Sequence, residues 1–201
     1  MIKSMRRGII TNGILTIILS LFGCSEGTKQ NNSNQSIYTP LTEQIIDTTS
    51  DDILLEIIFA NLSDKLQSGA YNKLYETVTS WNKSRQAIYM TCQLEAEVNN
   101  GGYDQFYFNN SGLFYKDLPG ALRLIGATKY ADLTERANDT FEKEKSKIDE
   151  DPDGITEGFN KYLENLPLYK FDKEFYKLNK NKNLQQIQVN YIRKNKKEFI
   201  D

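Results

Sequence analysis

The chain contains no histidine among its 201 residues. This absence excludes Ser-His-Asp and Cys-His nucleophile systems, histidine acid–base chemistry and nearly all zinc or non-haem iron sites. Cysteine is scarce, since only Cys24 and Cys92 occur, which are too few to form a metal cluster and need not be paired. With 39% apolar and 26% charged residues, the composition fits one ordinary globular domain and excludes collagen, a disulfide-dense miniprotein and wholesale disorder.

Long hydrophobic runs are also missing. The most continuous apolar stretch, Ile14 to Phe22, is far shorter than the ~20 residues of a membrane-spanning helix. Three basic residues and no acid accompany it within residues 1–23. A basic start, a short apolar middle and a small residue at the exit predict a secretory signal peptide over residues 1–23.

The exit of this signal reads Leu21-Phe22-Gly23-Cys24, which resembles the lipobox of bacterial lipoproteins. The resemblance implies that a diacylglycerol group is attached to the Cys24 thiol and that the chain is cleaved just before it. We therefore expect an exported protein that is lipid-anchored to the cell envelope, at the periplasmic or outer-membrane face.

Charge of one sign is not concentrated enough to suggest nucleic acid as a partner. Without residues 1–23 the chain holds 22 basic and 27 acidic residues, a net charge of −5. This mildly acidic balance argues against broad nucleic-acid affinity. Residues 170–201 differ from the rest, with nine basic and four acidic residues.

The sequence after Cys24 divides into a tether and a domain. Residues 24–50 are rich in Asn, Gln, Ser and Thr, and we expect a polar tether because such a segment buries little apolar surface. Ile45 and Ile46 indicate that its last residues dock on the domain. Residues 51–201 predict a single irregular all-α domain of about six to eight helices, because apolar residues recur at helical spacing. Helices are expected at about 51–69, 81–98, 118–126 and 130–148, just before Pro167, and at 184–199, while Tyr103–Phe108 is compatible with either a helix or a strand.

The densest concentration of polar and glycine residues surrounds an aromatic run at residues 103–108. Its candidate site residues are Glu97, Asn99, Asn100, Gly101, Gly102, Gln105, Asn109, Ser111 and Gly112. One interpretation is a polar pocket in which Glu97 is a base and the amides bind a ligand. The other, which we favour, is architectural, because Gly and Asn supply positive φ and cap helix ends. No histidine or lysine lies close in sequence to activate a nucleophile, so no catalytic residue is predicted.

The same segment carries a family resemblance. The runs Glu-Val-Asn-Asn-Gly-Gly-Tyr and Gln-Phe-Tyr-Phe-Asn-Asn-Ser-Gly resemble the signature of a bacterial family of unknown function that is named after the C-terminal domain of a DNA-mimic protein. Residues 121–127, 171–176 and 191–192 support the resemblance, which covers about residues 50–201. The resemblance implies an all-α fold. The best-known member of the family acts by protein contact, presenting carboxylates that imitate DNA phosphates. The mimicry does not transfer, because this chain is predicted to be exported and its last segment is basic.

Two charged segments have alternative interpretations. Asp149, Asp151, Asp153 and Glu157 are spaced like the ligands of an EF-hand loop, but Asn160 stands where the bidentate glutamate belongs. We favour an acidic turn over this weak calcium candidate, and no metal site is predicted. The basic run at residues 193–197 could contact anionic headgroups, although we favour a solvated helix end.

These observations together favour a membrane-anchored lipoprotein whose helical domain is a non-enzymatic protein-interaction module. Its expected partners are the membrane, through the lipid anchor, and a protein; nucleic acid and cofactors are not expected. Two alternatives stay open. One is a small-ligand-binding or weakly catalytic domain that uses Glu97, Asn100 and Gln105, and the other is a calcium-responsive lipoprotein.

Overall fold

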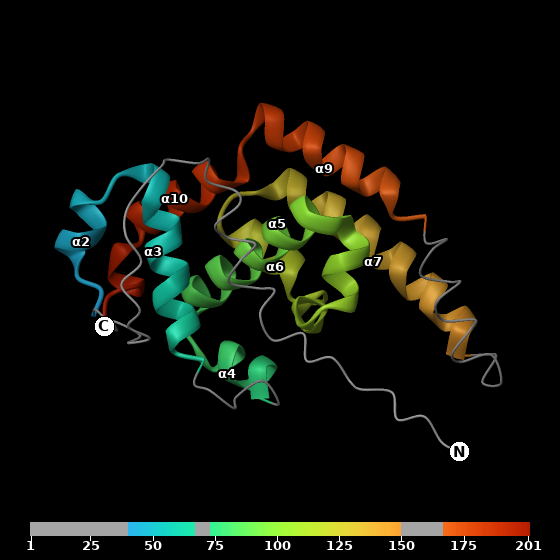
Figure 1. Ribbon diagram of the computed structural model, residues 1–201, viewed down its shortest axis with the longest axis horizontal. Coiled ribbons are helices and arrows are strands. Elements are labelled where there is room, and N and C mark those ends of the chain that lie inside the picture. Colours follow the sequence, from blue (N-terminus) through green and yellow to red (C-terminus); the bar gives the residue numbers. More distant parts are fainter. Residues whose placement is uncertain (1–39, 67–72, 150–166) are drawn as a thin grey trace, which may run out of the picture. The chain divides into compact units, whose positions relative to one another are not determined.

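A computed structural model describes residues 40–66, 73–149 and 167–201 (Figure 1). Every regular element within these ranges is helical, which confirms the predicted all-α fold and the predicted number of helices. No helix in the described ranges is long and apolar enough to cross a bilayer. The elements are α2 (Glu43–Thr48), α3 (Asp51–Asp64), α4 (Leu74–Ser80), α5 (Lys83–Phe108), the 3₁₀ helix η2 (Asn110–Phe114), α6 (Leu118–Leu124), α7 (Thr128–Asp149), α9 (Tyr169–Asn181), α10 (Leu184–Lys194) and the 3₁₀ helix η4 (Lys196–Glu198).

Helix α5 is the element around which the others pack. It contacts α3, α4, η2, α6 and α9, while α6 and α9 also pack on α7 (Figure 1). Its side chains Ile88, Leu94 and Val98 are fully buried, as are Tyr103 and Phe106 beyond them. The apolar surface that α5 buries against these helices therefore belongs to a single hydrophobic core.

Local sequence explains where several helices begin. The side-chain oxygens of Thr42, Asn82 and Asn183 accept hydrogen bonds from the backbone N–H groups of Ile45, Arg85 and Gln186, respectively. These contacts satisfy donors that a helix leaves unpaired in its first turn. They fix the starts of α2, α5 and α10.

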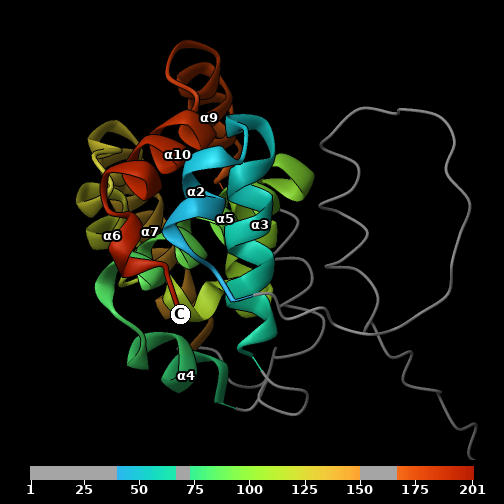
Figure 2. The same ribbon diagram turned by 90° about the vertical axis from the view of Figure 1, so that its left-hand side faces the viewer.

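The domain begins before the predicted boundary at residue 51. Helix α2 lies beside α10 and η4 (Figure 2), and Leu41 and Ile46 are buried in the core. Residues 41–50 are therefore part of the folded domain rather than of the polar tether. The hint from Ile46 is confirmed, because its side chain is fully buried.

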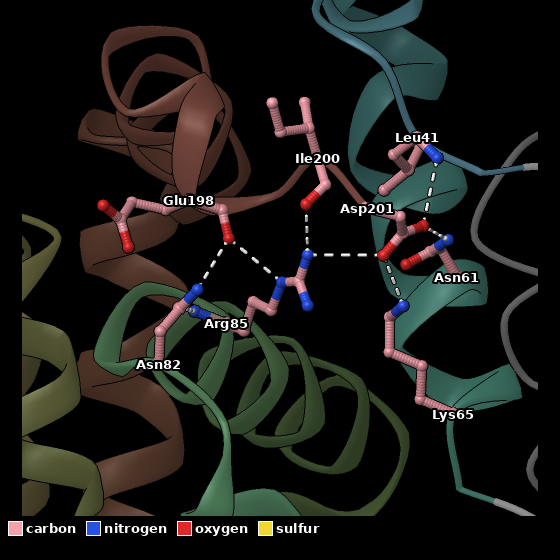
Figure 3. Close-up of polar contacts among 8 residues, drawn as sticks. All are labelled: Leu41, Asn61, Lys65, Asn82, Arg85, Glu198, Ile200 and Asp201. Carbon is pink, nitrogen blue, oxygen red and sulfur yellow. Dashed lines mark hydrogen bonds and ion pairs between the residues drawn. The ribbon is translucent and has the colours of Figure 1, made fainter.

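The end of the chain is tied to this first helical segment by Asp201 (Figure 3). Its side-chain carboxylate accepts hydrogen bonds from Leu41 N (3.1 Å), Asn61 Nδ2 (3.2 Å) and Lys65 Nζ (2.5 Å), and lies 3.3 Å from Arg85 Nη2. Its backbone N–H donates to the Leu41 carbonyl at 3.1 Å. Arg85 also donates to the carbonyl oxygens of residues 198 and 200. This cluster, which we call the Asp201 clamp, joins α3, α5 and the segment that follows η4.

The sequence left three of the α-helices unassigned, namely α2, α4 and α9. Helix α9 buries Phe171 and Phe175 and covers α5 and α7 (Figure 1). The predicted last helix, 184–199, ends earlier than expected, because residue 195 interrupts it and η4 follows. The predicted helix before Pro167 lies outside the described residues.

Candidate functional site

The polar motif lies at a kink in α5. Gly101 (φ −150°, ψ 20°) and Gly102 (φ 79°, ψ −175°) have non-helical backbone angles, and the helix resumes at Tyr103. The predicted stop at these glycines is therefore an interruption, and the open choice for Tyr103–Phe108 is settled as helix. Only glycine readily adopts the backbone angles of Gly102.

Helix α9 supplies hydrogen-bond partners for backbone groups of α5 that the kink leaves unpaired. Asp172 Oδ1 accepts a hydrogen bond from Tyr103 N at 2.8 Å, so its carboxylate caps the second part of α5. Tyr176 donates its hydroxyl to the Val98 carbonyl at 2.7 Å, which satisfies an acceptor at the end of the first part. The backbone of the kink is thus stabilised by side chains of a helix about seventy residues later in the chain.

Glu97, one helical turn before the kink, is the centre of a hydrogen-bond network that we call the Glu97 cage. Its side chain is 8% exposed. Oε2 accepts from Gln105 Nε2 (2.5 Å) and Asn109 Nδ2 (2.8 Å), and Oε1 lies 3.3 Å from Ser111 Oγ. Asn100 Nδ2 donates to Gln105 Oε1 at 2.9 Å and completes the network at its exposed side. The cage therefore joins both sides of the kink to η2.

Most predicted site residues are brought together in this way. Gly112 fits against the end of α5, because a Cβ at this position would collide with the carbonyl of Tyr107. Asn99 is half-buried on the last turn before the kink, and Gly101 is exposed at it. The oxygens of Glu97 are thus directed at donors within the same motif. These hydrogen bonds hold the two parts of α5 and η2 together, and the role of the motif stays a prediction from the sequence.

Two acids near the kink that the sequence did not single out have perturbed acidity. Desolvation by burial raises the pKa of Glu95 to about 7, although a hydrogen bond from Asn179 opposes the rise. Burial, together with the nearby Asp172 carboxylate, raises the pKa of Asp104 to about 6. Neither effect has a signal in the local sequence, because the surrounding groups come from α9.

The region between α7 and α9 forms a surface hollow of about 350 Å³. Its lining combines charges of both signs with one aromatic ring: Arg136, Asp139, Thr140, Lys170, Phe171 and Glu174. Arg136 donates to Glu174 at 2.5 Å, so part of this charge is neutralised across the hollow. The candidate residues of the cage are not among its lining residues.

Several predicted residues cannot be placed. Cys24 lies outside the described residues, as do Asp151, Asp153 and Glu157 of the calcium candidate, and of Asp149 only the backbone is described, at the end of α7. Within the described part of the chain no group of three or more acidic or sulfur side chains could hold a metal ion. The lipidation and calcium hypotheses thus stay as sequence predictions.

The sequence matches the model of one protein family. The model of the DMP19-like protein family matches residues 79–195, which is more than half of the chain. The chain belongs to the DMP19-like protein family. No curated protein and no solved structure matches it. The DMP19-like match begins within α4 and ends just after α10, so it includes the kink, the Glu97 cage and α9. The predicted resemblance is confirmed over this range.

Proposed function

We propose that this DMP19-like protein is an exported lipoprotein, anchored through Cys24, whose helical domain acts by contacting another protein rather than by catalysis. The contact surface is the end of α5 with the following 3₁₀ helix η2, which display Phe108 and Leu113, respectively. We call residues 108–113 the contact turn. Family membership supports the proposal, because the DMP19-like family is not a known enzyme family.

The observation that carries the proposal is the exposure of two large apolar side chains beside polar side chains that bond to one another. The polar side chains of the Glu97 cage hydrogen-bond to one another. In contrast, Phe108 and Leu113 are 37% and 51% exposed, although both are large and apolar. The Glu97 cage binds Asn109 and Ser111 of the same segment. Exposed apolar side chains on a segment that is fixed in this way are typical of a binding surface, since little conformational entropy is lost when a partner binds.

The arrangement of charges gives no support to DNA mimicry. Many exposed carboxylates of the domain lie in ion pairs: Arg123 with Asp132 and Glu135, Arg136 with Glu174, Lys116 with Glu142, and Lys196 with Glu43 and Asp47. A mimic of phosphates has to present carboxylates without a neutralising partner. We therefore propose contact through the apolar turn instead.

The anchor is tested by metabolic labelling with a radioactive fatty acid. Cys24→Ser should abolish labelling and leave a precursor of higher mass, because acylation needs that thiol. Cys92→Ala is the matched control and should be labelled like the natural chain, since Cys92 packs against the core. Labelling that survives Cys24→Ser would contradict the anchor.

The contact turn is tested by cross-linking in the intact cell envelope. A photoreactive amino acid at position 113 should give a discrete cross-linked protein product, and Phe108→Ala should weaken it by about tenfold, as expected for an interface aromatic. The control is a photoreactive residue at position 53, because Ile53 on α3 has a similar exposed fraction of 45%. Equal products at both positions, or none at position 113, would refute the contact turn.

A further inference from the structure

The charge of the basic terminal run is used within the domain. Arg193 pairs with Asp51 and donates to the carbonyls of Ile46 and Thr49. Lys196 lies 2.7 Å from Asp47 and 3.1 Å from a second acid on α2. These contacts hold α2 and α3 against the last helices. Within the run 193–197, for which the sequence left headgroup binding open, Arg193 and Lys196 thus have a structural role, whereas Lys194 and Lys197 are exposed.

A different set of cations faces outward on α9. Lys170, Lys173, Lys177 and Lys180 are all exposed. Their spacing of three and four residues places them on one side of the helix. The opposite side carries the buried Phe171 and its neighbours in the core. We call these four lysines the α9 lysine face.

The acids of α9 do not neutralise this face. Asp172 is bound to the backbone of the kink in α5, and Glu174 is paired with Arg136. None of the ion pairs between described residues involves the four lysines. The face therefore presents its positive charge to the surroundings, on a chain whose net charge is −5 without residues 1–23.

An exposed tyrosine borders the lysines. Tyr169 is 62% exposed at the start of α9, and the Lys173 ammonium lies 4.9 Å from the centre of its ring. Tyr176, 39% exposed, follows two turns later, but its hydroxyl is bound to the Val98 carbonyl at the kink, so Tyr169 is the tyrosine that borders the lysines. Tyrosine is suited to the boundary between headgroups and hydrocarbon because its ring is apolar and its hydroxyl is polar. Lysines beside an exposed tyrosine therefore fit a membrane surface.

We propose that the α9 lysine face rests on anionic phospholipid headgroups, so that the anchored domain lies on the membrane with α9 toward the lipid. Charge complementarity carries this assignment: an acidic domain is repelled by an anionic surface unless it approaches through a face whose cations are not in ion pairs, as on α9. Each lysine near such a surface strengthens binding by roughly fivefold. The inference goes beyond the proposed function, which needs only the anchor and the contact turn.

The test measures how fast individual lysines are acetylated on the full-length protein, purified as the cell produces it and reconstituted in lipid nanodiscs. Phosphatidylcholine discs are compared with discs that contain phosphatidylcholine and phosphatidylglycerol in about equal amounts. Lys170, Lys173, Lys177 and Lys180 should react at least about fivefold more slowly in the anionic discs at low salt, and high salt should remove the difference. Lys129 on α7 and Lys194 on α10, which are also exposed, should react equally in both.

A paired substitution distinguishes the face from total charge. Lys173→Gln with Lys177→Gln should remove most of the protection at the two remaining α9 lysines. Lys129→Gln with Lys194→Gln removes the same charge elsewhere and should leave the protection intact. Equal acetylation in both kinds of disc would overturn the inference, as would protection of all lysines alike. Protection by an added DNA fragment, without protection by anionic lipid, would instead assign the face to nucleic acid.

The same preparation keeps this inference separate from the proposed anchor. Intact mass reports whether Cys24 carries lipid, whatever α9 does. If the lipid is absent, the anchor is refuted, and flotation of the same protein with anionic or zwitterionic vesicles then measures binding by α9. Flotation that does not depend on anionic lipid would refute the α9 assignment in that case.

Discussion

Replacement of Gly102 by alanine should lower the free energy of unfolding by about 3–5 kcal/mol. The backbone angles of Gly102, φ 79° and ψ −175°, cost any other residue ~1–3 kcal/mol. The new Cβ would also stand 2.6 Å from Asp172 Oδ2. The carboxylate would have to move away from Tyr103 N, and the loss of a hydrogen bond to a charged group costs ~1.5–3 kcal/mol.

Thermal unfolding followed by circular dichroism measures this loss, and two other glycines serve as matched controls. For a chain of this size the expected decrease in Tm is roughly 6–20 °C. Gly126 also has a positive φ, 87°, but an added Cβ there meets nothing within 4 Å, so Gly126→Ala should show only the backbone cost. Gly120 lies within α6 and is open, so Gly120→Ala should stabilise the protein slightly. Equal losses for the alanines at 102 and 126 would refute the role assigned to Asp172.

Three further perturbations test other parts of the domain. Glu97→Gln should lower the unfolding free energy by about 1–3 kcal/mol in urea titrations, because it replaces a buried carboxylate with an amide whose N–H₂ would face donors; an unchanged midpoint would contradict the cage. The folded pKa of Glu95, about 7, lies above its ordinary value of 4.5, so the folded state binds this proton more tightly and stability should fall as pH rises from about 4.5 to 7. Glu95→Gln should flatten that decline and gain up to ~3 kcal/mol at pH 8, whereas an unaltered pH profile would show that Glu95 is well solvated. Asp201→Asn should cost about 1.5–3 kcal/mol in the same titrations, and Asp64→Asn, on the exposed end of α3, is its control.

Much of the fold could be predicted from sequence because most of the helices are marked locally. The recurrence of apolar residues at helical spacing indicates where α5 and α10 lie. Helix α9 was not assigned, although Phe171 and Phe175 have helical spacing, because its many lysines obscure the apolar positions. The kink could not be distinguished from a helix end, since Gly101 and Gly102 fit both until the partner on α9 is known.

The candidate site was predictable as a set of residues but not as a geometry. The sequence indicates only that four polar residues lie close together in the chain: Glu97, Gln105, Asn109 and Ser111. The structure shows that Glu97 accepts hydrogen bonds from the other three. Asp172 could not be assigned, because its hydrogen bond to Tyr103 joins residues far apart in the chain. The perturbed acidity of Glu95 has the same origin, since it depends on burial between elements.

The Asp201 clamp has a consequence for chain connectivity. Because Leu41 and Asp201 exchange backbone and side-chain hydrogen bonds, the beginning and the end of the folded domain are neighbours. A short linker could join them, and the chain could then be opened at a different surface turn with every helix kept in place. The packing of these helices therefore does not depend on which of them comes first in the polypeptide, and a circularly permuted domain should still fold.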